Sequence, residues 1–399
     1  MLKKSYMKNV PFVFSIIYLL LQFQFAYILD FPITISLITL PFVILSFVRI
    51  RFSIPLICTM ATVTALSVVN QLISKNVGNE IQFLRTLTLV LITIFGIGVA
   101  ISGELKLKNL AKIEFVLVSL VILTIISIAQ ALLGYRFGSF VTNPLGNFTY
   151  HYQYKADLNS SLTRASGLYS EPSFNALVCL SFVPLVFSIV SNRKRFFYIV
   201  LLLLYMTSTF SLTGILSLSV VLLLWILDDR KINFIRIFFF VTFITFMANY
   251  IVQRIETLSV TGSSANFRLI APVKAITEIL PQNILGIPLG SLENTIFRFG
   301  FLNGSKVGTS VDNGYLLLII YFGLAGLILT GAILIFSVRL ANTMRKLDMR
   351  GWQMAIVPAL ALNFNGGIFL PDFICIMIFI IVTIRYQFNL VKIEDKLYA

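Results

Sequence analysis

Charged residues are scarce in this sequence of 399 residues. Only 12% of the positions are Asp, Glu, Lys or Arg, whereas 58% are hydrophobic, and the mean hydropathy is +0.93. A soluble domain of this length needs far more polar surface to cover its core. The apolar residues stand in long runs, unlike the short alternation of outer-membrane barrel strands, so helices remain as the way to satisfy backbone groups in lipid. The composition therefore predicts an all-α, polytopic membrane helical bundle.

Residues that bind metals or form disulfides are also rare. His151 is the one histidine, and Cys58, Cys179 and Cys375 lie in apolar segments without paired spacing. This pattern argues against a zinc site and favours buried, reduced thiols. The sequence has no Asp-x-Asp pair and no Walker A motif, so neither a nucleotide-sugar transferase nor an ATP-driven pump is supported. We expect no metal and no cofactor.

The long apolar runs predict about twelve transmembrane helices in one transmembrane domain, 1–399. The first run reaches Leu29 and is followed by no cleavage site, so we expect a retained span and not a signal peptide. The net charge of +15 falls mainly on alternate connections, and Lys75 is the one basic residue of the short connections on the other side. This asymmetry predicts cytoplasmic termini and explains the charge without nucleic acid. The predicted spans are 11–29, 31–48, 54–73, 81–102, 113–133, 172–191, 195–210, 213–228, 233–252, 313–337, 352–369 and 371–388.

Two connections are long and polar, at residues 134–171 and 253–312. By the charge count both lie on the extracytoplasmic (periplasmic) face. Long loops on a rigid scaffold are where function usually lies, so we expect the active site there. Within the second loop, the apolar spacing of residues 268–280 predicts a short amphipathic helix near the interface.

The first loop ends in a run from Arg164 to Glu171-Pro172-Ser173 and then enters an apolar segment. Pro172 suits the first position of a helix, and Glu171 then lies at its cap, where the dipole favours a carboxylate. One interpretation is a capped helix start with Arg164 paired to Glu171. The other is a functional one, in which Glu171 takes a proton from a sugar hydroxyl and Arg164 binds phosphate.

The second loop has more basic than acidic side chains, with Arg254, Arg268, Lys274, Arg298 and Lys306 against Glu256, Glu278 and Glu293. Exposed ion pairs contribute only about 0–1 kcal/mol each, so an anionic ligand is a better reason for this cluster than stability, with solvated surface charge as the alternative. Asp312 and Asn313, followed by Tyr315, open the tenth span. They fit a helix cap, and Asp312 also provides a second carboxylate on the face of Glu171.

Two further features allow a structural and a functional interpretation. Arg85 lies in the fourth span near its outer end, where it either snorkels to the surface or lines a groove for a lipid phosphate. Tyr150, Tyr152 and Tyr154 either form an ordinary interfacial aromatic loop or stack on sugar rings.

These motifs resemble those of the Wzy-type O-antigen polymerases and the related O-antigen ligases. The resemblance rests on Arg164-x-x-Gly167-x-x-x-Glu171-Pro172, on Ser211-Leu-Thr213-Gly214, on Arg268 with the later Gly286 and Gly290, and on Asp312-Asn313-Gly-Tyr315 before Gly323 and Gly326. Two departures stand out. Relatives often carry an Arg where Leu212 stands, and ligases tend to have a His where Asp312 stands, which favours a polymerase.

The resemblance implies a metal-independent glycosyltransferase of the bacterial inner membrane. Its donor would be a glycan chain on undecaprenyl pyrophosphate, and its acceptor the terminal sugar of a second lipid-linked repeat unit in O-antigen or other surface polysaccharide biosynthesis. Partners would include membrane lipids, a chain-length regulator and a flippase. The implied roles are a base for Glu171 or Asp312, pyrophosphate binding for Arg164, Arg268, Arg85 and Arg298, and sugar binding for Tyr150, Tyr152, Tyr154, Asn313 and Tyr315.

Two other functions stay open at this point. An O-antigen ligase would share the architecture and differ in its acceptor. A flippase for lipid-linked oligosaccharides would place charged groups near the bilayer midplane, whereas the predicted spans are nearly free of charge apart from Arg85.

Overall fold

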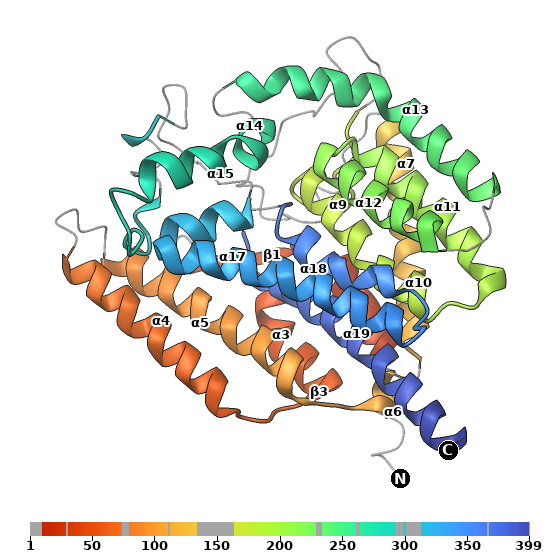
Figure 1. The fold of residues 1–399 in the computed structure, drawn as a ribbon, viewed down its shortest axis with the longest axis horizontal. Coiled ribbons are helices and arrows are strands. Elements are labelled where there is room, and N and C mark those ends of the chain that lie inside the picture. Colours follow the sequence, from red (N-terminus) through yellow and green to blue (C-terminus); the bar gives the residue numbers. More distant parts are fainter. Residues whose placement is uncertain are drawn as a thin grey trace.

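The long apolar runs form helices, because a helix satisfies its own backbone groups wherever lipid replaces water. The computed structural model describes residues 10–28, 31–73, 80–110, 112–133, 163–228, 234–260, 264–292, 295, 298–300, 313–364 and 367–398. Figure 1 shows these helices packed into one bundle around α19. The helices up to residue 133 are α2 (Val10–Leu19), α3 (Ile35–Phe47), α4 (Ile54–Ile73), α5 (Glu80–Ser102), α6 (Leu107–Leu110), η1 (Ile113–Val116) and α7 (Leu117–Leu133).

The second half of the chain is equally helical. Its helices are α9 (Pro172–Ser181), α10 (Val183–Ser188), α11 (Asn192–Thr209), α12 (Leu212–Asp228), α13 (Phe234–Glu256), η2 (Thr257–Ser259), α14 (Ser264–Leu269), α15 (Ala271–Lys274), η3 (Ala275–Ile279), α17 (Gly314–Lys346), η4 (Trp352–Ile356), α18 (Val357–Ala361) and α19 (Pro371–Tyr398). The prediction of an all-α membrane protein is confirmed in this general form.

Six helices of the described part are long and apolar enough to cross a membrane. Each of the six overlaps a predicted span. They cover residues 54–73, 80–102, 113–133, 236–259, 314–346 and 371–390. Five further apolar helices are shorter, between 10 and 17 residues. The number of crossings therefore stays a prediction.

The outer ends of the first two predicted spans are not helical. They form an antiparallel hairpin of β1 (Gln24–Ile28) and β2 (Phe31–Thr34), in which Ile28 lies opposite Phe31. The residue before a proline is pushed towards extended backbone, and Pro32 stands in β2, so the helix prediction over 11–29 and 31–48 was too long. A second small sheet pairs β3 (Val48–Arg49) with β4 (Glu104–Leu105).

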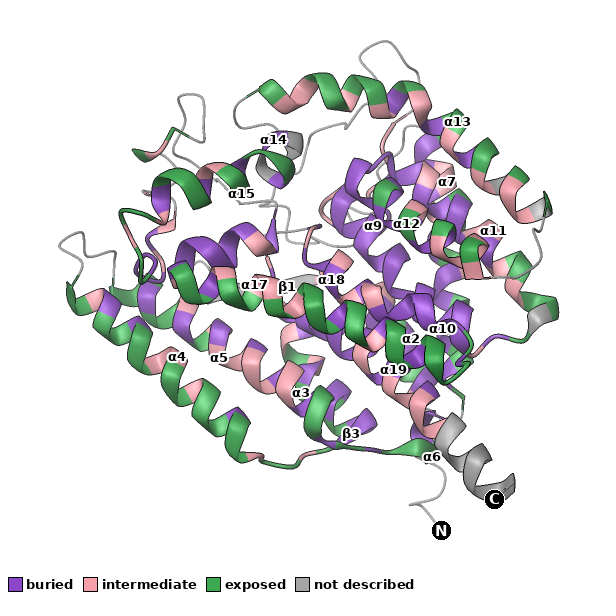
Figure 2. Cartoon of the chain, viewed as in Figure 1, coloured by how far each residue is buried: buried purple, intermediate pink, exposed green. Residues whose placement is uncertain are grey.

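The core lies where α2, α10 and α19 meet. The ring of Tyr18 packs 5.2 Å from Phe182 and 5.3 Å from Phe379, and Phe14 packs on both Tyr18 and Phe379. Of the apolar window of α19, 72% is buried, compared with 17% in α4. Figure 2 shows this gradient, with α4 largely exposed at the edge of the bundle. Because the exposed side chains of α4 include Ile54 and Leu72, its outer face suits lipid and not water.

Glycines allow the loop after η3 to enter the bundle beside α17. The helix is interrupted at Gly323, where φ is 57° and ψ is −129°. The freed backbone groups bond to the loop, since Leu324 N–H donates to Ile284 O over 2.9 Å and Ile287 N–H donates to Ile320 O over 3.0 Å. A Cβ on Gly286 would lie 2.2 Å from Tyr321 O. Two chain segments thus approach backbone to backbone.

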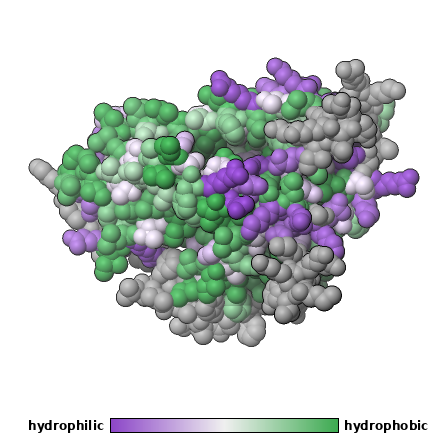
Figure 3. Space-filling model, turned by 90° about the horizontal axis from the view of Figure 1, so that it is seen from below, coloured by the Kyte–Doolittle hydropathy of each residue, from purple (hydrophilic) through white to green (hydrophobic). Residues whose placement is uncertain are grey.

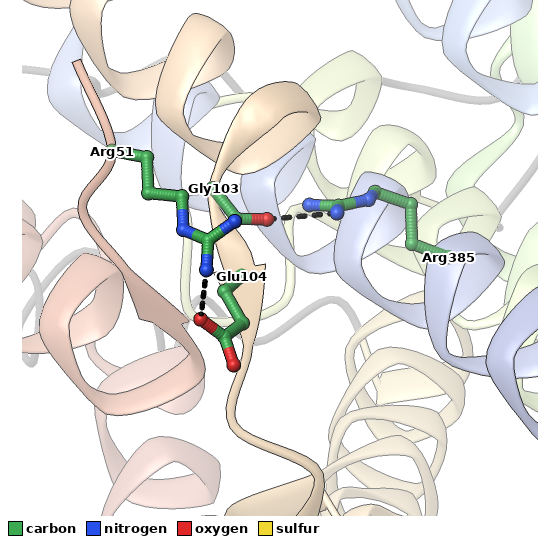
Figure 4. A network of polar contacts seen from close by, with 4 residues as sticks. All are labelled: Arg51, Gly103, Glu104 and Arg385. Atoms are coloured by element: carbon green, nitrogen blue, oxygen red, sulfur yellow. Dashed lines mark hydrogen bonds and ion pairs between the residues drawn. The ribbon is translucent and has the colours of Figure 1, made fainter. Parts of the chain in front are cut away.

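At the opposite end of the bundle, α19 is fastened to the end of α5 (Figure 4). The Arg385 guanidinium donates to Ala100 O over 2.5 Å and to Gly103 O over 2.8 Å. The exposed pair of Arg51 and Glu104 lies beside it, with 2.7 Å between Nη2 and Oε2. In Figure 1 this end includes α6 and the C-terminal end of α19, whereas α14 and α15 lie at the far end. Seen from below, hydrophilic side chains gather in the centre and on the right, and hydrophobic ones cover the left (Figure 3).

Candidate functional site

A cavity with three arginines lies at the end of the bundle near α14. Its empty volume is about 680 Å³, with the solvent at its mouth included. The cavity is lined by the segment before α9, the N-terminal half of α12, the end of α13, α14 and the end of α18. The lining residues are Arg164, Leu212, Thr213, Leu216, Ser217, Val220, Tyr250, Arg254, Arg268, Leu269, Leu360 and Asn363.

Arg268 is the most buried of these arginines, with 8% of its surface exposed. Its Nη2 donates to Phe364 O over 3.1 Å, and its own carbonyl accepts from the Asn313 side chain over 2.9 Å. The same Asn313 nitrogen donates to Asn363 Oδ1 over 3.0 Å. Burying a guanidinium is costly without compensating partners, so this set of contacts specifies where the charge of Arg268 lies.

Arg254 reaches the cavity from the end of α13. Its Nε donates to the hydroxyl of Tyr250, one turn earlier, over 2.9 Å, and the guanidinium lies 5.4 Å from the centre of that ring. Tyr250 in turn donates to the carbonyl of Phe210. Phe210 has a positive φ of 43° and ends α11, so the turn between α11 and α12 is linked to this arginine.

Arg164 lies on a non-helical segment that crosses the cavity wall. Thr163 N–H donates to Ala131 O over 3.2 Å, and Ala165 N–H donates to Ser208 O over 2.9 Å. The Gln130 amide bonds both backbone groups of Gly167, accepting over 2.8 Å and donating over 2.7 Å. These bonds substitute for a helix or sheet ladder and hold the segment against α7 and α11.

The same segment needs a glycine at position 167. Gly167 has φ +63°, and a Cβ there would lie 2.5 Å from Asn175 Oδ1. Asn175 itself donates to Ala165 O over 3.1 Å and accepts from the Tyr205 hydroxyl over 2.5 Å. The glycine of the Arg-x-x-Gly motif therefore meets a backbone requirement, and the Arg164 side chain lines the cavity.

Glu171 is the N-cap residue of α9, as the sequence predicts, with Pro172 at the first helical position. Its Oε2 accepts from the Ser173 hydroxyl over 3.1 Å. Two residues earlier, the Tyr169 hydroxyl donates to Tyr18 O over 2.9 Å, and burial raises the pKa of Tyr169 well above its ordinary value. Glu171 is not among the described residues that line the cavity, although Arg164 is seven positions away on the same segment.

The other predicted site residues are placed as follows. Asn313 caps α17 by accepting from Leu316 N–H over 3.2 Å, and it also holds Arg268. The Tyr315 hydroxyl donates to Ala359 O over 2.6 Å. Arg85 is exposed on α5, and Arg298 is exposed with its guanidinium 5.6 Å from the Phe299 ring. Neither of these two arginines is among the described lining residues. Asp312, Tyr150, Tyr152 and Tyr154 lie outside the described residues.

Sequence reasoning did not select Tyr250, Asn363 or Gln130 for the site. It placed Arg254 in the basic cluster of the second loop, but the spacing of Arg254 from Arg268 did not show that both side chains line one cavity. Leu212 was a partial indication in the sequence that α12 contributes to the site. It stands where relatives often carry an Arg, and in the fold it lines the same cavity as Arg254.

The amphipathic helix predicted over residues 268–280 is present as three shorter pieces, α14, α15 and η3. Pro272 lies at the start of α15, which explains the interruption because proline cannot donate within a helix. Arg268, Ala271, Ala275 and Ile279 are buried, whereas Val273 is 59% exposed. One face thus packs on the bundle, and the exposed face combines the apolar Val273 and Ile276 with the polar Thr277 and Glu278.

Among the residues that the structure describes, no group of three or more His, Cys, Asp or Glu side chains could hold a metal ion. The charged groups that converge at the cavity are arginines, which bind anions in a fork geometry that matches phosphate. The arrangement can therefore bind a phosphate-containing group.

Comparison with known proteins gives two matches. The sequence family described as "WcaD colanic acid polymerase" matches residues 10–386. A protein of Escherichia coli (strain K12) with the printed name "Putative colanic acid polymerase" is 25% identical over 383 residues, which cover 90% of this chain and 92% of that protein. No solved structure matches.

Proposed function

Because the chain belongs to the WcaD colanic acid polymerase family, we propose that it is a membrane glycosyltransferase that polymerises lipid-linked repeat units of a surface polysaccharide. The donor is a growing glycan on undecaprenyl pyrophosphate. The acceptor is the terminal sugar of a second lipid-linked repeat. The reaction takes place at the periplasmic face of the inner membrane, and a chain-length regulator and a flippase are the expected partners.

The observation that carries this proposal is the convergence of Arg164, Arg254 and Arg268 on one cavity. When an acceptor hydroxyl attacks the anomeric carbon of the donor, the bond to the lipid pyrophosphate breaks and the pyrophosphate gains negative charge. Preorganised cationic donors stabilise such a leaving group in the transition state. Three arginines supply this charge from the chain itself, so the proposed reaction uses no metal.

The apolar part of the cavity suits a lipid-linked substrate. Leu212, Leu216 and Val220 follow one another at helical spacing along α12 and line the cavity. Leu216 and Val220 are each 43% exposed. Eight residues of helix extend about 12 Å, so this apolar stripe leads from the arginines towards the middle of α12, where a prenyl chain could leave into the bilayer.

Glu171 is the proposed base, with Asp312 as the alternate. Glu171 lies on the segment that carries Arg164, so a carboxylate and a pyrophosphate-binding group share one rigid support. The acceptor sugar would lie between them, with Asn313 and Tyr315 near by and Tyr150, Tyr152 and Tyr154 contributed by the first loop. Pyrophosphate binding by Arg85 and Arg298 stays a prediction, since they are not among the described lining residues.

The test uses cells that lack the polymerase and carry an Arg164→Gln or Arg268→Gln variant. We expect both variants to insert normally and to make no long chains, so that single lipid-linked repeats accumulate. Arg339→Gln is the matched control, because Arg339 is exposed on α17 and is not among the described lining residues. Long chains from Arg164→Gln or Arg268→Gln would contradict the proposal, and Arg85→Gln and Arg298→Gln decide the roles of those residues.

The accumulated product separates the proposed function from its alternatives. A defective polymerase leaves single repeats that have already crossed the membrane. A defective flippase leaves them inside the cell, and a defective ligase leaves finished chains on their lipid carrier. Polymerisation of lipid-linked repeats by the purified protein should also continue in excess chelator, and its loss there would contradict metal independence.

A further inference from the structure

Asp372 is a buried acidic side chain that the proposed reaction does not use. Among the charged residues that the structure describes, only Arg268 and Asp372 are buried, and Asp372 is 5% exposed. It stands at the start of α19, directly after Pro371. A carboxylate in this position is costly, so hydrophobic packing would serve the stability of the bundle better.

One glutamine connects Asp372 to the segment that carries Glu171. Gln22 Nε2 donates to Asp372 Oδ2 over 2.7 Å. Gln22 Oε1 accepts from Ser170 N–H over 2.8 Å and from the Ser170 hydroxyl over 3.0 Å. Phe373 N–H donates to the other oxygen, Asp372 Oδ1, over 2.9 Å. Residues 22, 170 and 372 thus meet although they are far apart in sequence.

The chemistry of the partners determines the orientation of this network. Ser170 N–H can only donate, so the oxygen of the Gln22 amide must face it. The amide nitrogen then faces Asp372, which must present an acceptor. Because Phe373 N–H also needs an acceptor, residue 372 has to accept on both sides at once, as a carboxylate does.

We infer that Asp372 is a positioning residue, which holds Ser170 through Gln22 and thereby orients the neighbouring Glu171 for its reaction. This inference rests on the proposed function, in which Glu171 receives the proton of the acceptor hydroxyl. Asp372 does not line the described cavity and touches no substrate. It acts by limiting the positions that Glu171 can take, because a displacement of about 1 Å can cost on the order of 100-fold in rate.

The orientation argument gives an exchange test. In Asp372→Asn, the side chain can accept from only one of Gln22 Nε2 and Phe373 N–H, and its NH₂ group opposes the other donor. In Gln22→Glu, two carboxylates face each other. In the double variant Gln22→Glu with Asp372→Asn, the introduced amide accepts from Phe373 N–H and donates to the introduced carboxylate, which still accepts from Ser170. In the double variant each hydrogen-bond donor of this network therefore faces an acceptor again.

The measurement is the steady-state rate of the purified variants on lipid-linked repeats extracted from cells that lack the polymerase, normalised to folded protein. We expect each single variant to lower kcat at least about tenfold with KM changed less than about threefold, and the double variant to recover most of kcat. Asp228→Asn is the matched control. Asp228 accepts from Trp352 Nε1 over 2.5 Å and from Gln353 Nε2 over 3.0 Å, a similar cluster at the C-terminal end of α12.

Each other outcome overturns the inference. Unchanged kcat in the single variants would show that the contact is not needed. A loss that the double variant does not recover, or that Asp228→Asn shares, would show a general effect on packing. If Glu171→Gln loses activity while Asp372→Asn keeps it, only the positioning role fails and the proposed function stands. If Glu171→Gln keeps full activity, the proposed base is wrong, and the role of Asp372 fails with it.

Discussion

The side-chain amide of Asn313 donates to the backbone carbonyl of Arg268 over 2.9 Å, across 45 positions of sequence. The oxygen of the same amide caps α17 through Leu316 N–H. One residue therefore both begins a long helix and fixes the backbone of a cavity arginine. A motif residue that looks like a helix cap in the sequence has a second contact that only the fold shows.

The two roles of Asn313 can be separated by substitution. Asn313→Asp keeps the oxygen that caps α17 but loses the donation to Arg268 O, so we expect near-normal thermal stability and polymerisation reduced about tenfold or more. Asn313→Ala loses both, and the missing cap should cost about 1 kcal/mol of additional stability. Thermal unfolding in detergent and the glycan ladder measure the two effects. Equal activity of Asn313→Asp and the unmodified protein would contradict the link to Arg268.

Gly286 is predicted to tolerate no side chain. In Gly286→Ala the methyl group would have to fit at a φ of +86° and 2.2 Å from Tyr321 O, and neither backbone can yield without breaking the bonds beside Gly323. Strain and overpacking together should cost about 2–6 kcal/mol. We expect little folded protein on size-exclusion chromatography.

Gly331→Ala is the matched control for that substitution, since a Cβ at Gly331 meets nothing within 4 Å. It lies within α17 and should stabilise the protein by up to about 1 kcal/mol through helix propensity. Similar yields of folded protein from Gly286→Ala and Gly331→Ala would show that the close approach of the loop to α17 is wrong.

Tyr250→Phe tests how Arg254 is held. The substitution removes the hydroxyl that accepts from Arg254 Nε and donates to Phe210 O, but it keeps the ring. We expect a raised KM for the lipid-linked donor and a stability loss of about 1–3 kcal/mol from the unpaired carbonyl. Tyr198→Phe, on α11, is the control and should leave KM unchanged. An unchanged KM in Tyr250→Phe would mean that Arg254 does not depend on this hydroxyl.

Most helices of this fold could be predicted from the sequence, because long apolar runs without internal breakers have one stable backbone state in lipid. The prediction was wrong where local chemistry changed inside an apolar run. The hairpin before Ile35 pairs two strands that are neighbours in sequence, whereas the interruption at Gly323 depends on backbone partners about 40 residues earlier, at Ile284 and Gly286. Apolar content alone does not distinguish a helix from such a segment.

The site residues also fall into those that the sequence predicted and those that it did not. Arg164 and Arg268 were recognised because they stand in motifs beside polar loops, and the fold brings them to one cavity. The convergence of Arg254 with Arg164 and Arg268 on one cavity, and the contact of Gln22 with Asp372, could not be predicted, because spacing in sequence does not give distance in space. A buried acid beside Pro371 was a usable signal, since charges within spans are rare and expensive.

Arg385 is predicted to matter for stability and not for activity. Its guanidinium donates to Gly103 O (Figure 4) and to Ala100 O at the end of α5, where helix carbonyls lack partners and the dipole favours a cation. Arg385→Met should leave both carbonyls unsatisfied and cost about 1–3 kcal/mol. Arg51→Gln breaks an exposed ion pair in the same region and should cost at most about 1 kcal/mol.

Thermal unfolding in detergent measures the stability of both variants. Polymerisation per folded molecule should stay the same in both, because this end of α19 is remote from the arginine cavity. A larger loss from Arg51→Gln than from Arg385→Met would show that the exposed pair, and not the contact of α19 with α5, fastens this end of the bundle.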